Sequence, residues 1–317
     1  MSLPEVFLPE PLHIPDGFLN LPVSLIFWGI TIVMVGIAVR RSQTELGERQ
    51  VPLMGVMAAF IFAAQMINFP VAGGTSGHLL GGALAAIVLG PWAGILVMTT
   101  VVGVQALFFQ DGGLLVLGAN IFNMGILTVL IGFGLYRGVR NRAASVKMAA
   151  AGLAAWLSVL AGALMTALQL WISGTSALEI VLPAMLSVHA LIGIGEALIT
   201  VGALVFITQT RPDLLSSSAE QGGRGWVIAG VLISLAVVLI SPLASASPDG
   251  LERVAINLGF IDRGQNAPYQ ILPDYTLPFL GETAASTILA GAIGALVAGI
   301  LLIGIARGLR QRKTSES

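Results

Sequence analysis

The chain has 317 residues, of which 56% are hydrophobic and 10% are charged, and its mean hydropathy is +0.92. Soluble globular domains carry about 25% charged residues, so this composition excludes an ordinary soluble protein and predicts a chain that lies mostly in a membrane. The chain has no cysteine, which excludes disulfides and thiolate metal sites and leaves nitrogen and oxygen as the ligands for any metal.

The first twelve residues hold three prolines and two acidic residues. They have neither the basic start nor the small-residue cleavage pattern of a signal peptide, so we interpret residues 1–12 as an N-terminal extension. The next segment, residues 13–19, reads His-Ile-Pro-Asp-Gly-Phe-Leu. Its Pro-Asp-Gly is typical of a turn, here leading into the first membrane segment.

Nine apolar segments follow, with lengths that suit helices crossing a hydrocarbon layer about 30 Å thick. Residues 90–92, Gly-Pro-Trp, interrupt one long apolar run. We interpret this interruption as a turn between two short helices, with a re-entrant hairpin as the alternative. The nine segments cover residues 18–39, 51–69, 78–89, 93–109, 114–136, 148–172, 182–207, 226–240 and 284–305.

These segments predict an all-α polytopic membrane protein in two units. A seven-helix unit covers residues 13–209, and a polar linker follows at residues 210–225. A two-helix accessory unit covers residues 226–306, and residues 307–317 form a tail. The accessory unit contains a loop at residues 241–281 that is too long for a simple connector.

Basic residues lie almost entirely on one side of this topology. Of the fifteen Lys and Arg residues, thirteen fall on the side of the linker and the tail, and only Arg253 and Arg263 fall on the other side. The positive-inside rule therefore places the linker and the tail in the cytoplasm and the N-terminus outside. Ten acidic residues fall on the outer face, where they either steer cations or are ordinary solvated loop residues.

The chain has three histidines, His13, His78 and His189, all near the outer half of the predicted membrane unit. Imidazole is a natural ligand of late first-row divalent metals, and a histidine in a membrane segment is a functional hypothesis. His78 lies among five glycines in residues 72–82, which let backbone approach a ligand, although small residues also serve helix packing. For His189, a hydrogen-bonded structural role is the stronger interpretation.

Glu196 is the one carboxylate inside a predicted span, and it shares a helical face with His189, seven residues earlier. It either orients an imidazole or anchors helices through hydrogen bonds, and we favour the anchoring role. The chain has no phosphate-binding loop, so any ATP-driven step needs another subunit. It also has no catalytic or nucleic-acid-binding motif, so we expect a transport subunit that is not an enzyme and binds no nucleic acid.

Five motifs together resemble the CbiM/NikM family, the substrate-specific components of energy-coupling factor transporters for cobalt and nickel. The motifs are residues 13–19, 68–82, 110–113 (Gln-Asp-Gly-Gly), 118–125 and 189–197. Residues 247–252, Ser-Pro-Asp-Gly-Leu-Glu, together with Pro273-Asp-Tyr275, resemble the PDGLE domain, a CbiN/NikN-like accessory unit that is here fused to the first.

The resemblance implies a multi-pass protein of a prokaryotic plasma membrane, with membrane lipid around it. Its partners would be a CbiQ/NikQ-like transmembrane coupling protein and CbiO/NikO-like cytoplasmic ATPases. Co²⁺ or Ni²⁺ would be the transported substrate, and no cofactor would be bound permanently. The imported cobalt would supply cobalamin biosynthesis, or the imported nickel would supply nickel enzymes.

The family holds its metal with the N-terminal amine, the backbone nitrogen and imidazole of a histidine after the initiator methionine, and a second imidazole. His13 and His78 match these two histidines. Twelve residues precede His13, so we expect the mature chain to start at Leu12, read as methionine, or to be cleaved just before it. The implied mechanism has the ion enter from the outer face, with help from the loop around Asp249 and Glu252.

In that mechanism His13 and His78 bind the ion, and His189 is an alternate ligand or orients one. Two other mechanisms stay open. In the first, a gradient-driven carrier relays protons through Glu196 and His189. In the second, the chain is an intramembrane metalloenzyme, which would need an open coordination position beside a carboxylate. Cobalt and nickel both accept imidazole and amine donors, so the resemblance covers both metals alike.

Overall fold

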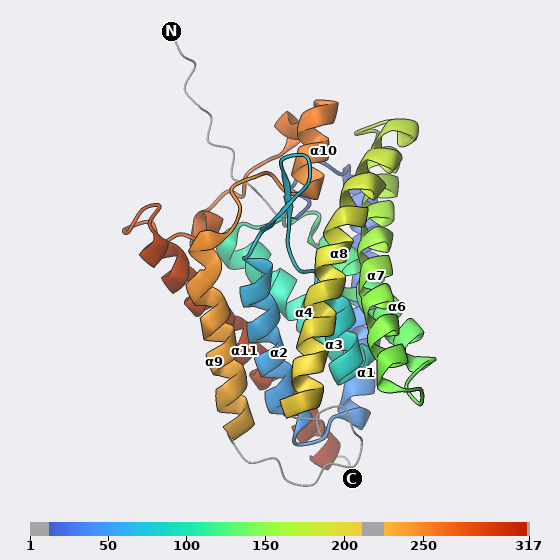
Figure 1. Cartoon of the computed structure of the whole chain (residues 1–317). Helices are drawn as coiled ribbons and strands as arrows, with labels where there is room; N and C mark the ends of the chain where they lie inside the picture. Colours follow the sequence, from blue (N-terminus) through green and yellow to red (C-terminus); the bar gives the residue numbers. More distant parts are fainter. Residues whose placement is uncertain (1–12, 211–224, 316–317) are drawn as a thin grey trace.

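The computed structural model describes residues 13–210 and 225–315 (Figure 1). It is a predominantly helical bundle, and seven of its helical stretches are long and apolar enough to cross a membrane, which confirms the predicted fold class. The α-helices are α1 (Leu21–Glu45), α2 (Gln50–Gln65), α3 (Gly82–Leu89), α4 (Pro91–Val104), α5 (Leu117–Asn120), α6 (Thr128–Arg137), α7 (Ala144–Ile172), α8 (Leu178–Thr210), α9 (Gly225–Ile240), α10 (Gly250–Leu258) and α11 (Ala284–Ser315).

Shorter elements complete the chain. Two π-helical turns, η1 (Gln105–Phe109) and η2 (Ile121–Leu127), extend α4 and connect α5 to α6. Three 3₁₀ turns are η4 (Ser241–Leu243), η5 (Ile261–Arg263) and η6 (Pro273–Tyr275). The strands β1 (Phe69–Val71) and β2 (Thr75–Gly77) form an antiparallel hairpin.

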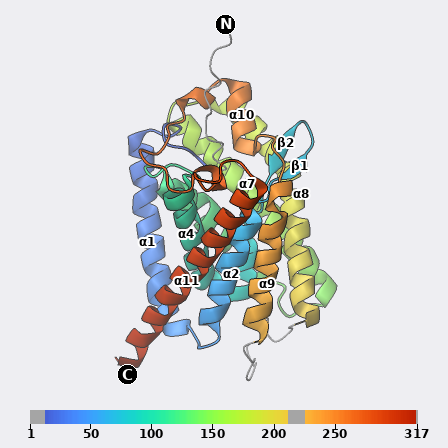
Figure 2. The same cartoon turned by 90° about the vertical axis from the view of Figure 1, so that its left-hand side faces the viewer.

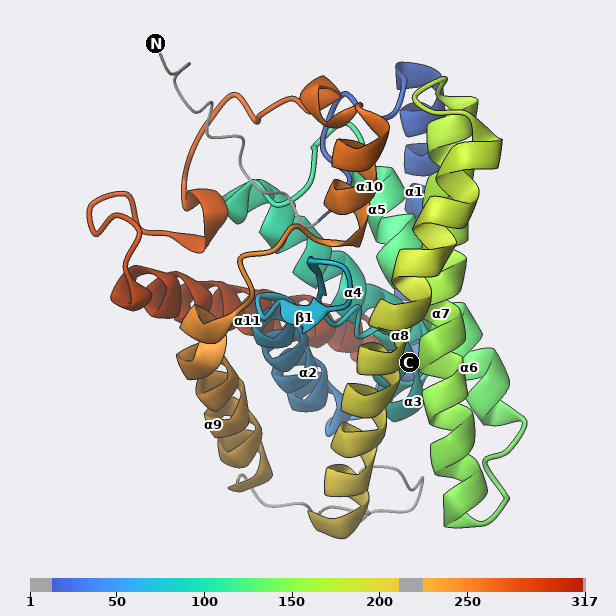
Figure 3. The ribbon, with the colours of Figure 1, turned by 45° about the horizontal axis from the view of Figure 1, so that its top comes forward.

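The bundle has two ends. Figures 1 and 2 show α10 and the β1–β2 hairpin at one end, which we call the site end. The other end, the linker end, carries the last turn of α8 and the first turn of α9. Residues 244–283, which we call the roof loop, run from η4 to the start of α11 and include α10 (Figure 3).

The third predicted segment, a short helix at residues 78–89, is shorter in the structure than predicted. Only Gly82–Leu89 is helical there, and eight residues of α-helix rise about 12 Å, too little to cross a membrane. Residues 78–81 are not helical, and Gly81 has a φ of +80°. Irregular backbone at membrane depth is tolerated where the protein buries and satisfies it, and Glu196 does so here by accepting hydrogen bonds from the Leu80 and Gly81 amides.

The second predicted segment also ends early, because α2 stops at Gln65 and the chain then enters the β1–β2 hairpin, which the sequence did not predict. Gly73 and Gly74, with φ of +78° and +71°, form its turn. Farther on, Gly90 has a φ of +83° and Pro91 begins α4, so the predicted break at residues 90–92 does separate two helices.

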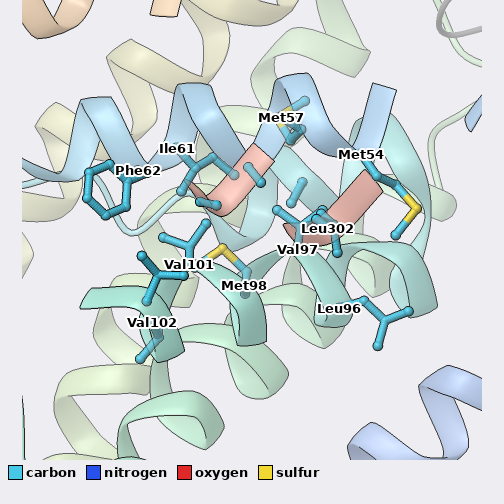
Figure 4. Packing of buried hydrophobic residues seen from close by; sticks show 14 of the residues in the cluster. Met54, Met57, Ile61, Phe62, Leu96, Val97, Met98, Val101, Val102 and Leu302 are labelled. Carbon is cyan, nitrogen blue, oxygen red and sulfur yellow. The ribbon is translucent and has the colours of Figure 1, made fainter. Parts of the chain in front are cut away.

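Helix α11 of the accessory unit packs directly into the seven-helix unit. A Cβ on Gly55 of α2 would lie 2.4 Å from Ile303, so the two helices approach as closely as small residues allow. Figure 4 shows the apolar packing between α2, α4 and α11. Its fully buried side chains include Met54, Ile61, Val97, Met98 and Leu302. This apolar cluster, which we call the core, joins the two predicted units into one body.

Helix α10 was not predicted inside the loop at residues 241–281. It begins at a capping box, in which Asp249 accepts from the Glu252 amide at 2.7 Å and Glu252 accepts from the Asp249 amide at 3.3 Å. An acidic cap residue followed three positions later by Glu is a helix-start signal, so the sequence did carry the information.

Candidate metal site

The segment at residues 13–19 is clamped by the chain around α5. The Asn120 side chain exchanges two hydrogen bonds with the backbone of Ile14, accepting from its amide at 3.1 Å and donating to its carbonyl at 3.0 Å. The Gly113 amide donates to the same carbonyl at 2.9 Å. The Asp16 carboxylate accepts from three successive amides, those of Leu114, Leu115 and Val116. The turn residues thus fix the position of His13.

His13 is buried, with 3% of its surface exposed. Its Nδ1 lies 3.2 Å from the Asp111 carbonyl oxygen and 3.3 Å from the Asp111 carboxylate oxygen Oδ1. Both neighbours are hydrogen-bond acceptors, which favours the tautomer with its proton on Nδ1 and its lone pair on Nε2. Nε2 is buried and has no hydrogen-bond partner among the described residues, which is the state of a nitrogen ready to bind a cation.

His78 lies in the non-helical passage before α3. Its Nδ1 is 3.0 Å from the Leu79 carbonyl oxygen. The loop that carries it is held from two sides. Glu196 accepts from the amides of Leu80 at 2.6 Å and Gly81 at 2.9 Å, and Gln65 donates to the Leu80 carbonyl at 2.7 Å.

The two rings meet although they are far apart in sequence. The centroids of His13 and His78 are 5.7 Å apart, with the ring planes at 76°. Both residues line a cavity of about 80 Å³, together with His189 and Asp249. The cavity therefore brings together all three histidines and one carboxylate of the roof loop.

His189 is held against the backbone of its own helix, α8. Its Nδ1 is 2.8 Å from the Met185 carbonyl, one turn earlier. The roof loop covers its other side, since a Cβ on Gly250 would lie 2.8 Å from Cε1 and 3.0 Å from Nε2 of His189. A side chain at position 250 would therefore force α10 or the imidazole to move.

Asp249 is buried over the cavity, with 4% of its surface exposed. Burial raises the pKa of its carboxyl well above the usual range, and the nearby carboxylates of Glu252 and Asp111 raise it further. Glu252 lines a second cavity, of about 290 Å³, between the roof loop and the 13–19 segment. His13 lines both cavities, so it stands between the larger one and the site.

Direct hydrogen bonds hold the roof loop to the hairpin. Ser76 donates twice, from its amide to the Pro248 carbonyl at 2.9 Å and from its hydroxyl to the Ser247 carbonyl at 2.7 Å. The Arg253 guanidinium donates to the Gly74 carbonyl. Arg253, one of two basic residues predicted on this face, is thus part of the closure of the site.

Within residues 13–210 and 225–315, no three His, Cys, Asp or Glu side chains are grouped closely enough to hold a metal by themselves. The site is a pair of imidazoles, with His189 and Asp249 on the same cavity wall. The Glu196 carboxylate is bonded to the amides of Leu80 and Gly81, in the loop that carries His78. From the sequence, Asp111 was counted only among the ten acidic residues of the outer face, and Asn120 was given no role, although both lie in the quoted motifs. Leu12, the expected start, lies outside the described residues.

Comparisons with known proteins agree with this architecture. The family described as "Cobalt uptake substrate-specific transmembrane region" (CbiM) matches residues 13–214, and the PDGLE domain matches residues 224–311. The chain is 38% identical over 306 residues to a putative fused nickel transport protein NikMN of Archaeoglobus fulgidus, covering 93% of this chain and 97% of that protein.

A cobalt transport protein CbiM of Geobacter sulfurreducens is 33% identical over 230 residues, which cover 68% of this chain and 65% of that protein. A crystal structure described as a truncated transition metal transporter has a TM-score of 0.57 and 31% identity. It covers 62% of this chain and 98% of its own.

Proposed function

The chain belongs to the CbiM family of cobalt-uptake transmembrane proteins, and we propose that it is the substrate-capture component of an ATP-driven importer of Co²⁺ or Ni²⁺. One observation carries the proposal: His13 and His78, 65 positions apart, converge on one buried cavity. Its cobalt- and nickel-transporting relatives support the metal class.

The spacing of the two rings suits a shared ion. With metal–nitrogen distances of about 2.0 Å, two imidazoles on one ion have centroids about 4.5 Å apart in cis and about 6.4 Å apart in trans. The observed 5.7 Å lies between these limits. We infer that His13 and His78 bind the ion through Nε2, that Asp249 offsets its charge, and that His189 is an alternate ligand.

The start of the chain decides which nitrogen His13 uses. A chelate ring that includes the backbone nitrogen of His13 closes with six members through Nδ1, and it does not close through Nε2. In the described geometry Nδ1 faces Asp111. A chain that begins Met-His13 would therefore turn the ring and bind through amine, amide and Nδ1, whereas the longer chain binds through Nε2.

ATP hydrolysis would come from partner proteins. The chain has no phosphate-binding loop, so a CbiQ/NikQ-like coupling protein and CbiO/NikO-like ATPases would drive release. With the site end outside and the linker end in the cytoplasm, as the positive-inside rule indicates, the ion enters from the second cavity past His13. The imported metal would serve cobalamin synthesis or nickel enzymes.

A proton-relay carrier is less well supported. Both carboxylate oxygens of Glu196 accept backbone amides, and Nδ1 of His189 is bonded to the Met185 carbonyl. Neither group is aimed at the other. Uptake into vesicles that hold all partners distinguishes the two mechanisms, because ATP depletion at a constant ion gradient stops the importer and leaves a gradient-driven carrier running.

Equilibrium binding of Co²⁺ and Ni²⁺ to the purified protein tests the capture site. We expect the full chain to bind one ion, a chain starting Met-His13 to bind more tightly, and His78→Ala to lose roughly hundredfold or more in affinity, since a ligand is removed. Ser187→Ala, on the exposed face of α8 two residues before His189, is the control. Equal binding by the full chain and His78→Ala would reject the site.

A further inference from the structure

Tyr275 connects the roof loop to His13. Its hydroxyl donates to Oδ2 of Asp111 at 2.6 Å, and Oδ1 of the same carboxylate lies 3.3 Å from Nδ1 of His13. A chain of three polar groups therefore runs from the accessory unit to the imidazole. Burial, and then the charge of Asp111, raise the pKa of the Tyr275 hydroxyl well above its usual range, so it remains a donor.

The tyrosine ring is held in place by the seven-helix unit. It stacks on Phe109, with centroids 4.8 Å apart and planes at 22°, and it lies tilted against Phe62 at 6.1 Å. Phe109 ends η1, two residues before Asp111. The ring and the carboxylate that it contacts are thus positioned by the same short stretch of chain.

The backbone of the roof loop is bent sharply to deliver this side chain. Asp274 and Tyr275 have φ of +50° and +55°, a region that residues other than glycine avoid. Such conformations persist where surrounding contacts hold them, and they gather at functional sites. Here the Leu272 amide donates to the Phe108 carbonyl at 2.9 Å, which fixes the approach to the bend.

We propose that Tyr275 is a positioning residue for His13, acting through Asp111. By holding the Asp111 side chain, it keeps the carboxylate 3.3 Å from Nδ1 and steadies the residue whose main-chain carbonyl is bonded to Nδ1, so that the ring presents Nε2 to the cavity. The accessory unit would then set the affinity of the site for Co²⁺ or Ni²⁺ without contributing a ligand there. This inference rests on the proposed function and applies to the full chain, since it takes His13 to bind the ion through Nε2 while Nδ1 stays on Asp111.

Groups that contact the other nitrogen of a metal-binding imidazole affect metal affinity by a known amount. Removing one typically weakens metal binding by about 10- to 100-fold, because the ring loses its orientation and some of its basicity. Tyr275→Phe removes only the hydroxyl and keeps the ring on Phe109. We therefore expect it to weaken Co²⁺ binding about tenfold, at the lower end, since Asp111 itself remains.

The experiment is equilibrium binding of Co²⁺ to the purified full chain, with the ligand-field absorption of the bound ion recorded at saturation. Tyr269→Phe removes a hydroxyl from the same loop and is the matched control, expected to bind and absorb like the wild type. Asp111→Asn should weaken binding at least as much as Tyr275→Phe. The double variant Asp111→Asn with Tyr275→Phe should then be no weaker than Asp111→Asn alone.

The absorption spectrum separates positioning from folding. A shifted spectrum of saturated Tyr275→Phe, with unchanged thermal unfolding of the metal-free protein, supports the inference. Wild-type affinity and spectrum in Tyr275→Phe would overturn it, and so would additive losses in the double variant. If Tyr275→Phe folds poorly, wild-type affinity in Asp111→Asn alone would overturn it as well. If the wild type binds no Co²⁺ or Ni²⁺ at all, the proposed function itself fails.

Discussion

The core between α2, α4 and α11 and the roof loop at the site end are held together by different interactions. In the core, Met98 and the other residues labelled in Figure 4 have buried, apolar side chains. In the roof loop, short turns are held by individual hydrogen bonds, such as those from Ser76 and Tyr275. Apolar packing tolerates little change of volume, whereas a hydrogen bond depends on one donor and one acceptor.

The contrast implies a separation of roles. Changes in the core should alter the stability of the whole bundle and leave the metal affinity of the folded fraction unchanged. Changes around the site should alter metal affinity and cost little stability. The following variants test this separation, starting with the largest expected effect.

Gly82→Ala should break the fold. A Cβ on Gly82 would lie 1.8 Å from Oγ1 of Thr128 and 3.0 Å from the Met124 carbonyl, so α3 could not remain packed on α6. We expect a loss of about 3 kcal/mol or more in stability. Thermal unfolding in detergent measures it, with Gly103→Ala as the control because its Cβ would meet nothing within 4 Å. Equal stability of the two variants would contradict the close packing.

Glu196→Gln lies on the boundary between the two regions. Glutamine keeps one acceptor oxygen but turns an amide NH₂ toward one of the two backbone amides that the carboxylate now accepts, so the His78 loop should loosen. We expect about 10- to 100-fold weaker Co²⁺ binding, with about 1–3 kcal/mol of lost stability. The exposed Glu179→Gln in the same helix should change neither quantity. Unchanged binding by Glu196→Gln would mean that the carboxylate does not position His78.

Gly250→Ala should act on affinity with little effect on stability. The added methyl would press on His189 and, at 2.7 Å, on Cδ1 of Ile192, so α10 must lift slightly from the cavity. We expect a cost of about 1 kcal/mol, or about fivefold in metal affinity. Gly202→Ala in α8, where a Cβ meets nothing within 4 Å, serves as the control in the same titration. A large drop in thermal stability would show that the roof loop is packed like the core.

Asp249→Asn should have the smallest effect, and it should raise stability, whereas the preceding variants lower it. The carboxyl has a raised pKa in the folded chain, so folding favours its protonated form. The stability that the protonated carboxyl contributes is fully present below the ordinary carboxyl pKa of about 3.9. It is lost as the pH rises through the raised pKa of the folded chain. Asparagine also caps helices, so the variant should unfold at a higher temperature than the wild type at pH 7 and at the same temperature at pH 4.

The same variant should bind Co²⁺ more weakly at pH 7, because asparagine cannot ionise beside the bound cation as the Asp249 carboxyl can. The unfolding temperatures and the binding constants come from one protein preparation. A lower unfolding temperature at pH 7 would indicate that the ionised carboxylate stabilises the roof loop through contacts with its partners.

Much of the core was predictable from the sequence, whereas much of the site was not. Long apolar runs such as Ala144–Ile172 predict helices because hydropathy alone determines what a membrane accepts. Hydropathy does not distinguish a buried glycine loop from a helix, which is why residues 78–81 were predicted as helical. His13 and His78 were predicted by resemblance, but the roles of Asp111 and Tyr275 depend on a contact between residues 164 positions apart.

Covalent fusion has a consequence for how the roof loop finds its site. Residues 211–224 join α8 to α9, so roof and site belong to one molecule and their association does not depend on how much of either is made. A tethered partner acts at an effective concentration on the order of millimolar. Dilution therefore cannot separate the two, and each candidate site has one roof loop whatever the expression level.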